Sequence, residues 1–184
     1  MNESMNFQRI CEGTTTVFIP EQQTKQKGPG KKQGLPFYNP AMELNRDISI
    51  AVIQGLISEN EDKRYDLLDG LAATGVRGIR FAQELTGSFQ ITINDWSEEA
   101  YSVIQKNVEE HSFDSVIATN RDLNSLLHEK KFDYIDVDPF GSPVMFMDAA
   151  MQSIRHRGII AVSATDTAAL CGVYPKVCKR RYAS

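Results

Sequence analysis

The sequence predicts an α/β protein with a Rossmann-like, doubly wound parallel sheet. Short apolar runs alternate with helical patterns along the chain, the first of these runs leads into a turn of small residues, and several runs end at acids. Such alternation is typical of parallel strands joined by crossover helices. The strands are expected at residues 65–69, 89–94, 116–119, 132–137 and 158–163. The sheet is expected to stop after about this fifth strand.

Composition limits the class of protein. The chain has 184 residues, 41% hydrophobic and 24% charged, which suffices for one sizeable core. Cys11, Cys171 and Cys178 form no Cys-x-x-Cys pair, so neither a disulfide framework nor a bound metal is expected. The net charge of -4 argues against a lysine-coated nucleic-acid protein, although a local basic patch can still bind phosphate. Because no apolar run reaches the roughly 20 residues of a membrane span, we expect a cytoplasmic protein without a membrane partner.

Two segments precede the sheet. Residues 7–20 carry β-type residues around Glu12-Gly13 and predict a small hairpin. Residues 22–34 are rich in glycine and lysine and predict a flexible basic loop, either a solvated linker or an arm that touches phosphates.

Helices are expected between the strands. The first begins at Asn39-Pro40 and runs to about residue 58, and Arg46 lies off its apolar stripe. The stripe that we expect to be buried consists of Leu44, Ile48, Ala51, Val52 and Leu56. Further helices are expected up to about residue 85 and at residues 98–110, 143–154 and 174–182. The last is basic, with solvated surface and phosphate contact both open.

Acids and small residues after the strands predict a nucleotide site. The turn at residues 70–78 lets the backbone approach a ligand at the start of a helix. Asp95 follows the second strand, about 20 residues past the turn, where an acid binds ribose hydroxyls. Asp122 follows the third strand and is placed for an adenine amino group.

The fourth strand leads into Asp138-Pro139-Phe140-Gly141, a loop shaped by proline. Loops at the carboxyl ends of parallel strands face the ligand crevice, so Asp138 and Phe140 are expected to project into it. An acid beside an aromatic suits a flat nucleobase with an amino group, which stacks on the ring and donates to the carboxylate.

These motifs together resemble S-adenosylmethionine-dependent methyltransferases that modify amino groups of bases. Four runs are more specific and resemble the tRNA (guanine-N2-)-dimethyltransferases that act on guanine 26. They are residues 37–40 (Phe-Tyr-Asn-Pro), 45–47 (Asn-Arg-Asp), 69–77, and 136–143 (Asp-Val-Asp-Pro-Phe-Gly-Ser-Pro). The resemblance extends from about residue 12 to the end of the chain. The usual three alternating glycines of a methyltransferase turn are Leu71, Ala73 and Gly75 here, a departure that this family shares.

The resemblance implies S-adenosylmethionine as cofactor and tRNA as partner. The residues implied to form the donor site are Arg46, Asp69, Gly75, Arg77, Asp95, Asp122 and Leu123, the last through its backbone or side chain. Phe37 and Phe140 would sandwich a flipped guanine, and Asp138 would hold its exocyclic N2 and take up the released proton.

The resemblance also implies a domain division. Residues 1–34 would form the hairpin and basic loop, and residues 35–184 an incomplete methyltransferase catalytic domain that lacks two strands and a tRNA-binding C-terminal domain. Such a fragment would bind donor and tRNA weakly and methylate little. It could self-associate through the open edge of the strand at residues 158–163.

Three alternatives stay open at this point. The acceptor could be another nucleobase, for example adenine N6 in DNA, because Asp-Pro-Phe reports only an amino-bearing ring. The chain could be a binding module without catalysis. A nicotinamide dehydrogenase fits less well, because the glycine fingerprint is incomplete and Asp138 and Phe140 would have no role in hydride transfer.

Overall fold

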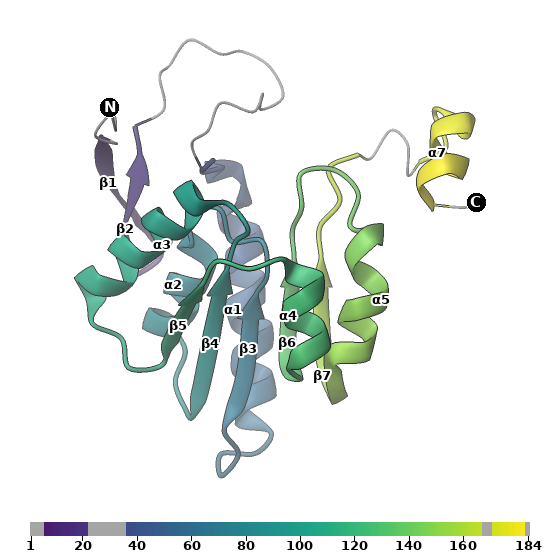
Figure 1. The fold of residues 1–184 in the computed structure, drawn as a ribbon. Coiled ribbons are helices and arrows are strands. Elements are labelled where there is room, and N and C mark those ends of the chain that lie inside the picture. Colours follow the sequence, from purple (N-terminus) through teal and green to yellow (C-terminus); the bar gives the residue numbers. More distant parts are fainter. Residues whose placement is uncertain (1–5, 22–35, 167–170, 183–184) are drawn as a thin grey trace.

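The computed structural model describes residues 6–21, 36–166 and 171–182 (Figure 1). Its centre is a five-stranded parallel sheet in the order β5-β4-β3-β6-β7. The strands are β3 (Tyr65–Asp69), β4 (Phe89–Asn94), β5 (Val116–Thr119), β6 (Phe132–Val137) and β7 (Ile154–Val162). All five predicted strands are confirmed. β7 starts four residues earlier than expected, and its register against β6 shifts between Phe132 and Tyr134.

The order of the strands places a topological switch between β3 and β6. From β3 the chain proceeds outward to β4 and β5, and from β6 it proceeds in the opposite direction to β7. In open α/β sheets, ligands bind at the carboxyl ends of the strands at such a switch. Asp69 pairs in register with Asp136 there, so the ends of β3 and β6 lie side by side.

Helices cover both faces of the sheet (Figure 1). One core cluster joins β3 and β4 to the helices α1 (Glu43–Ser58), α2 (Val76–Glu84) and α3 (Glu98–His111). The other joins β6 to α4 (Leu123–Glu129) and α5 (Val144–Ser153). A 3-10 helix, η1 (Pro40–Met42), precedes α1, and α7 (Pro175–Tyr182) stands apart from the sheet. The fold class is thus confirmed, while α4 was not predicted from the sequence.

The predicted buried stripe of α1 is wrong except for Leu56. Leu44 is 69% exposed and Ile48 56% exposed, and Ala51 and Val52 are exposed as well. The buried residues are Arg46, Ser49, Ile53, Leu56 and Ile57. The face with two polar residues turns inward because Arg46 and Ser49 find buried partners there, which offsets the cost of their desolvation.

The predicted hairpin is confirmed as β1 (Phe7–Glu12) and β2 (Thr15–Pro20), paired antiparallel. It packs on α2 and α3, with Val17 and Ile19 in the same core cluster as α1. The side chain of Asn107 on α3 accepts from Phe18 N at 2.7 Å and donates to Phe18 O at 2.9 Å. The hairpin therefore contributes to the main core.

Some predictions concern residues that the structure does not describe or test. The basic loop at residues 22–34 lies outside the described residues. The predicted basic helix lies within them and is confirmed as α7. Within the described ranges β7 pairs with β6 alone, so self-association through its other edge stays a prediction. No helix among the described residues is long and apolar enough to cross a membrane.

Candidate active site

Carboxylates from two neighbouring strands meet at the topological switch. Asp69 ends β3, Asp136 lies in β6, and both are buried. Asp69 Oδ2 accepts a hydrogen bond from Gly78 N at 3.0 Å, and Tyr134 OH donates to Asp136 Oδ2 at 3.0 Å. Burial raises the pKa of both carboxyl groups, and the nearby Asp136 charge raises the pKa of Asp69 further. The pair therefore favours holding a proton more than isolated carboxylates would.

Arg77 at the start of α2 is the cation of this cluster. Its Nη1 lies 3.3 Å from Asp136 Oδ2, and its Nη2 donates to Asp138 Oδ2 at 3.2 Å. Its remaining contacts are with α1, where Ser49 Oγ accepts at 2.9 Å and Asn45 Oδ1 at 2.8 Å. Although burial opposes its charge, the surrounding carboxylates raise the pKa of Arg77 above its ordinary value. Arg77 thus connects α1 to the carboxylates at the end of β6.

Phe37 and Phe140 lie against each other although they are 103 positions apart in the sequence. Their ring centroids are 6.2 Å apart and their planes are tilted by 57°. Phe37 is 40% exposed and Phe140 79% exposed, so both rings are accessible. A flat base between two parallel rings needs a separation of about 7 to 8 Å. A modest rotation and separation of the rings would therefore admit one.

The loop that carries Phe140 is tied to the loop after β7. Gly141 N donates to Thr165 Oγ1 at 2.8 Å, and Thr165 N donates to Gly141 O at 3.1 Å. Gly141 has a φ of 112°, a conformation that L side chains rarely adopt. These contacts hold the loop while Phe140 itself projects into solvent.

Asp95 joins the turn after β3 to the end of β4. Its Oδ2 accepts from Ala73 N at 2.8 Å, and its Oδ1 accepts from Ser97 N at 2.9 Å. Burial raises the pKa of Asp95, and the backbone N–H groups of Ser97, Ala73 and Trp96 oppose that rise. A carboxylate offers about four acceptor positions, so these backbone donors leave room for a ligand hydroxyl. Asp95 thus fits the predicted ribose contact.

Asn94 is a site residue that the sequence reasoning missed. It is fully buried, and its Nδ2 donates to Gly70 O at 3.1 Å and to Arg121 O at 3.0 Å. Its Oδ1 accepts from Thr119 Oγ1 at 2.8 Å and from Arg121 N at 3.2 Å. Asn94 therefore joins the carboxyl ends of β3, β4 and β5. An amide closing an apolar strand directly before Asp95 was the available signal.

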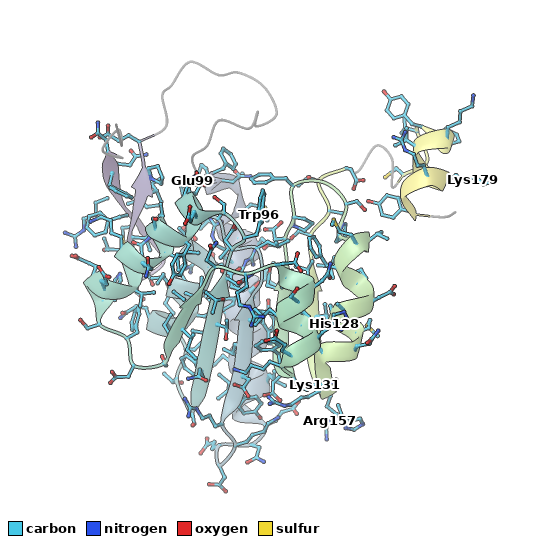
Figure 2. The ribbon with its side chains drawn as sticks, viewed as in Figure 1. Trp96, Glu99, His128, Lys131, Arg157 and Lys179 are labelled. Carbon is cyan, nitrogen blue, oxygen red and sulfur yellow. The ribbon has the colours of Figure 1, made fainter. Side chains whose placement is uncertain are left out.

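Trp96, which was also missed, is exposed on the loop after β4 (Figure 2). It directly follows Asp95 and precedes Ser97, which caps α3. A large exposed aromatic at the carboxyl edge of the sheet offers a flat face to a ligand.

Asp122 and Leu123 begin α4. Asp122 is exposed, and its Oδ1 accepts from Ser125 N at 2.9 Å and from Ser125 Oγ at 3.1 Å, so it is the N-cap of this helix. The Leu123 side chain is buried, and a Cβ built on Gly70 would lie 2.9 Å from its Cδ1. The whole Leu123 residue is only 1% exposed, so the structure argues against a ligand contact through its side chain.

Gly75 has a structural reason to be glycine. It precedes α2 with a φ of 75°, and a Cβ built there would lie 3.0 Å from Ile104 Cγ1. A side chain at this position would strain the turn and crowd α3.

Arg46 is buried and paired, unlike the solvated arginine that the helical pattern alone favours. Its Nε and Nη2 donate to the two oxygens of Glu12 at 2.5 and 2.6 Å. Its Nη2 also donates to Asn39 O at 3.0 Å, and Tyr38 OH donates to Glu12 at 2.7 Å. Burial raises the pKa of Glu12, but the hydrogen bonds from Arg46 and Tyr38 outweigh it and lower that pKa overall. The hairpin thus anchors the segment that carries Phe37.

No group of three or more His, Cys, Asp or Glu side chains suited to a metal ion occurs among the described residues. The predicted absence of a bound metal stays a prediction.

Comparison with known proteins connects this geometry to a family. The family model described as N2,N2-dimethylguanosine tRNA methyltransferase matches residues 13–184. The chain belongs to this family. A tRNA (guanine(26)-N(2))-dimethyltransferase from Methanosarcina barkeri is 41% identical over 187 residues and is covered to 47%, while 98% of this chain is aligned. A protein of the same description from Pyrococcus abyssi is 39% identical, with 97% of this chain and 48% of that protein covered.

A solved structure agrees with the fold. Trm1 from Pyrococcus horikoshii, in complex with S-adenosyl-L-methionine, superposes with a TM-score of 0.78 at 37% identity. The alignment covers 95% of this chain and 47% of Trm1. This member of the dimethylguanosine methyltransferase family thus spans about half the length of the relatives it matches.

Proposed function

We propose that this chain supplies the donor site and the acceptor-base site for transfer of methyl groups from S-adenosylmethionine to N2 of guanine 26 in tRNA. One arrangement carries the proposal. Asp138 is a partly exposed carboxylate, and it lies two residues before Phe140 in the loop where the Phe140 ring contacts the Phe37 ring. Its membership in the dimethylguanosine methyltransferase family supports the same reaction.

The donor site would lie at the carboxyl ends of β3, β4 and β5. Asp95 would accept hydrogen bonds from the ribose hydroxyls, and Asp122 and the backbone of Leu123 would face the adenine. The exposed ring of Trp96 would add a flat apolar face beside them. When bound, S-adenosylmethionine supplies a methyl group activated by its sulfonium. The polar and aromatic groups of this set of residues therefore fit the adenosine part of the methyl donor.

The other residues predicted to bind the methyl donor would lie around this site. Asp69 and Gly75 would shape the turn, the first through its bond to Gly78 N and the second through its positive φ. Arg46 and Arg77 would border the donor from α1 and α2, although in this structure carboxylates of the protein hold both.

The acceptor chemistry would depend on Asp138. The N2 lone pair of guanine is delocalised into the ring, so attack on the methyl group requires the nitrogen to become more tetrahedral. A carboxylate that accepts an N2–H bond favours this change and can take the released proton. Phe37 and Phe140 would hold the base for in-line transfer after it has left its stack in the tRNA.

The rest of the chain would support these sites. We place the catalytic domain at residues 35–184 and assign residues 1–34 to a hairpin that braces it and a basic loop. The basic side chains Lys176, Lys179 and Arg180 of α7 are candidates for phosphate contacts with tRNA. Action on tRNA agrees with the cytoplasmic location expected from the sequence.

Two measurements on the purified chain test the proposal. Calorimetry should detect binding of S-adenosylmethionine and none of NAD. With protein in excess over RNA, labelled methyl groups should be transferred to a tRNA transcript with guanine 26 and not to the same transcript with adenine 26 or to DNA. Absence of donor binding, or transfer that does not depend on guanine 26, would contradict the proposal.

A further inference from the structure

The run Asn45-Arg46-Asp47 on α1 makes three separate polar connections. Asn45 accepts from Arg77, Arg46 donates to Glu12, and Asp47 accepts from Arg80 at 2.7 Å. The connections of Arg46 and Asp47 join α1 to the hairpin and to α2. The connection of Asn45 leads to Arg77 and from there to Asp138, which the proposed reaction uses.

Two neutral acceptors on one face of α1 receive the Arg77 guanidinium. Asn45 and Ser49 are four residues apart and therefore lie on the same side of the helix. Nη2 donates to Asn45 Oδ1 at 2.8 Å, and Nη1 donates to Ser49 Oγ at 2.9 Å. We refer to Asn45 and Ser49 as the α1 clamp.

The carboxylates lie along the same two nitrogens. Nη1 is 3.3 Å from Asp136 Oδ2 and Nη2 is 3.2 Å from Asp138 Oδ2, so each nitrogen faces one clamp residue and one carboxylate. A guanidinium is planar with donors in a fixed fork, so two fixed acceptors determine the direction of its other N–H bonds. Without the clamp, the two buried carboxylates Asp69 and Asp136 would attract Arg77 away from Asp138.

We infer that Asn45 and Ser49 are positioning residues for methyl transfer, which hold the Arg77 guanidinium against Asp138. Arg77 occupies Oδ2 of Asp138, so Oδ1 is the oxygen left to accept the N–H of the acceptor amine. One free oxygen serves both transfers of a dimethylation, because the amine keeps one N–H after the first methyl group. This inference rests on the proposed function.

The α1 helix offers a matched control for the test. Ser49 Oγ donates to Asn45 O at 3.1 Å and Ser58 Oγ donates to Gln54 O at 2.8 Å, so both serines bond the carbonyl four residues earlier. Only Ser49 of these two also accepts from Arg77. Ser49→Ala therefore removes the Arg77 contact together with a contact to the Tyr134 hydroxyl, and Ser58→Ala controls for the loss of the helical bond. Asn45→Asp keeps an acceptor that Asn45→Ala removes.

The rate of a single turnover is the first measurement, taken with saturating donor and protein in excess over tRNA. Ser49→Ala and Asn45→Ala should each lower the rate about tenfold, and the double variant about 100-fold, because a misplaced group near the reacting atoms costs this much. Ser58→Ala should stay within about twofold of the parent, and Asn45→Asp should recover part of the rate that Asn45→Ala loses. A loss of donor affinity with an unchanged saturated rate would overturn the positioning role.

Nuclear magnetic resonance of the Arg77 guanidinium is the second measurement and needs no activity. In the parent, hindered rotation should give separate signals for the two Nη groups, and in the double variant these signals should merge. Separate signals in the double variant would refute the clamp. Merged signals with an unchanged rate would refute its role in methyl transfer. A parent that transfers no methyl group would instead count against the proposed function, while the signals still decide whether the clamp exists.

Discussion

Replacing Asp95 by alanine should weaken donor binding and also loosen the turn after β3. The carboxylate accepts from Ala73 N at 2.8 Å and from Ser97 N at 2.9 Å, and it is buried. Ala73 has a φ of 49°, a conformation that few residues other than glycine adopt, so the turn depends on this bond to stay in place. Asp95→Ala removes both bonds and the acceptor for the ribose.

The expected losses follow from the number of hydrogen bonds. Two hydroxyl bonds to a carboxylate in a closed site contribute roughly 2 to 4 kcal/mol, which corresponds to about a 30- to 900-fold rise in the donor Kd. The two backbone bonds should cost about 2 to 4 kcal/mol of unfolding free energy, since water satisfies part of the loss. Asp95→Asn keeps one acceptor oxygen and should fall between the parent and the alanine variant.

Calorimetry with S-adenosylmethionine measures the first loss and urea unfolding the second. Asp114→Ala is the matched control, because Asp114 is an exposed acid just before β5 and should change neither quantity. If Asp95→Ala still unfolds cooperatively and binds the donor with the parent Kd, the assignment of Asp95 to the donor is wrong.

Three further predictions concern the neighbouring residues. Asp138→Asn should lower turnover about 100-fold or more, because an amide is a poorer acceptor and takes up no proton; donor binding should persist, and a near-parental rate would remove Asp138 from the reaction. Phe140→Ala should weaken capture of the base by about 1 to 3 kcal/mol, the contribution of one stacking ring, measured as a slower single turnover with an unchanged donor Kd. Burial and the charge of Asp136 raise the pKa of Asp69 to about 7. Between about pH 4 and pH 7 the folded state therefore binds more protons than the unfolded state. The free energy of unfolding should fall as the pH rises through this range. Asp69→Asn should flatten this fall in urea unfolding at several pH values, and an unchanged slope would contradict the raised pKa.

Local patterns in the sequence were sufficient for the strands and for the edge of the sheet at which the candidate residues meet. β3, β4 and β6 are apolar runs that end at acids, and parallel topology places their carboxyl ends at one edge. The adjacency of Phe37 and Phe140 agrees with what the family resemblance implies.

Tertiary partners decided what the sequence could not. Arg46 and Ser49 lie on the buried face of α1 because Glu12 and Arg77 meet them there, and those partners are 34 and 28 positions away. Helical periodicity assigns the most apolar face of a helix to the core. It cannot show that distant partners satisfy buried polar side chains, so it placed Leu44 and Ile48 inside. The same holds for Arg77, whose contact with Asp138 spans 61 positions.

α4 escaped prediction for a different reason. It has seven residues, too few for a periodic pattern to stand out. The cap was readable, because Asp122 accepts from the backbone of Ser125 three residues later, as a typical N-cap does. Asp122 was predicted to contact a ligand, and its capping role was not predicted.

Identification of the methylated nucleoside tests the central claim most directly. The parent chain and Asp138→Asn would each be incubated in excess over tRNA with labelled S-adenosylmethionine, and the RNA digested to nucleosides for mass spectrometry. We expect N2-methylated guanosine from position 26 with the parent and at least about 100-fold less with the variant. Label on another base or position, or equal label from the two proteins, would contradict it.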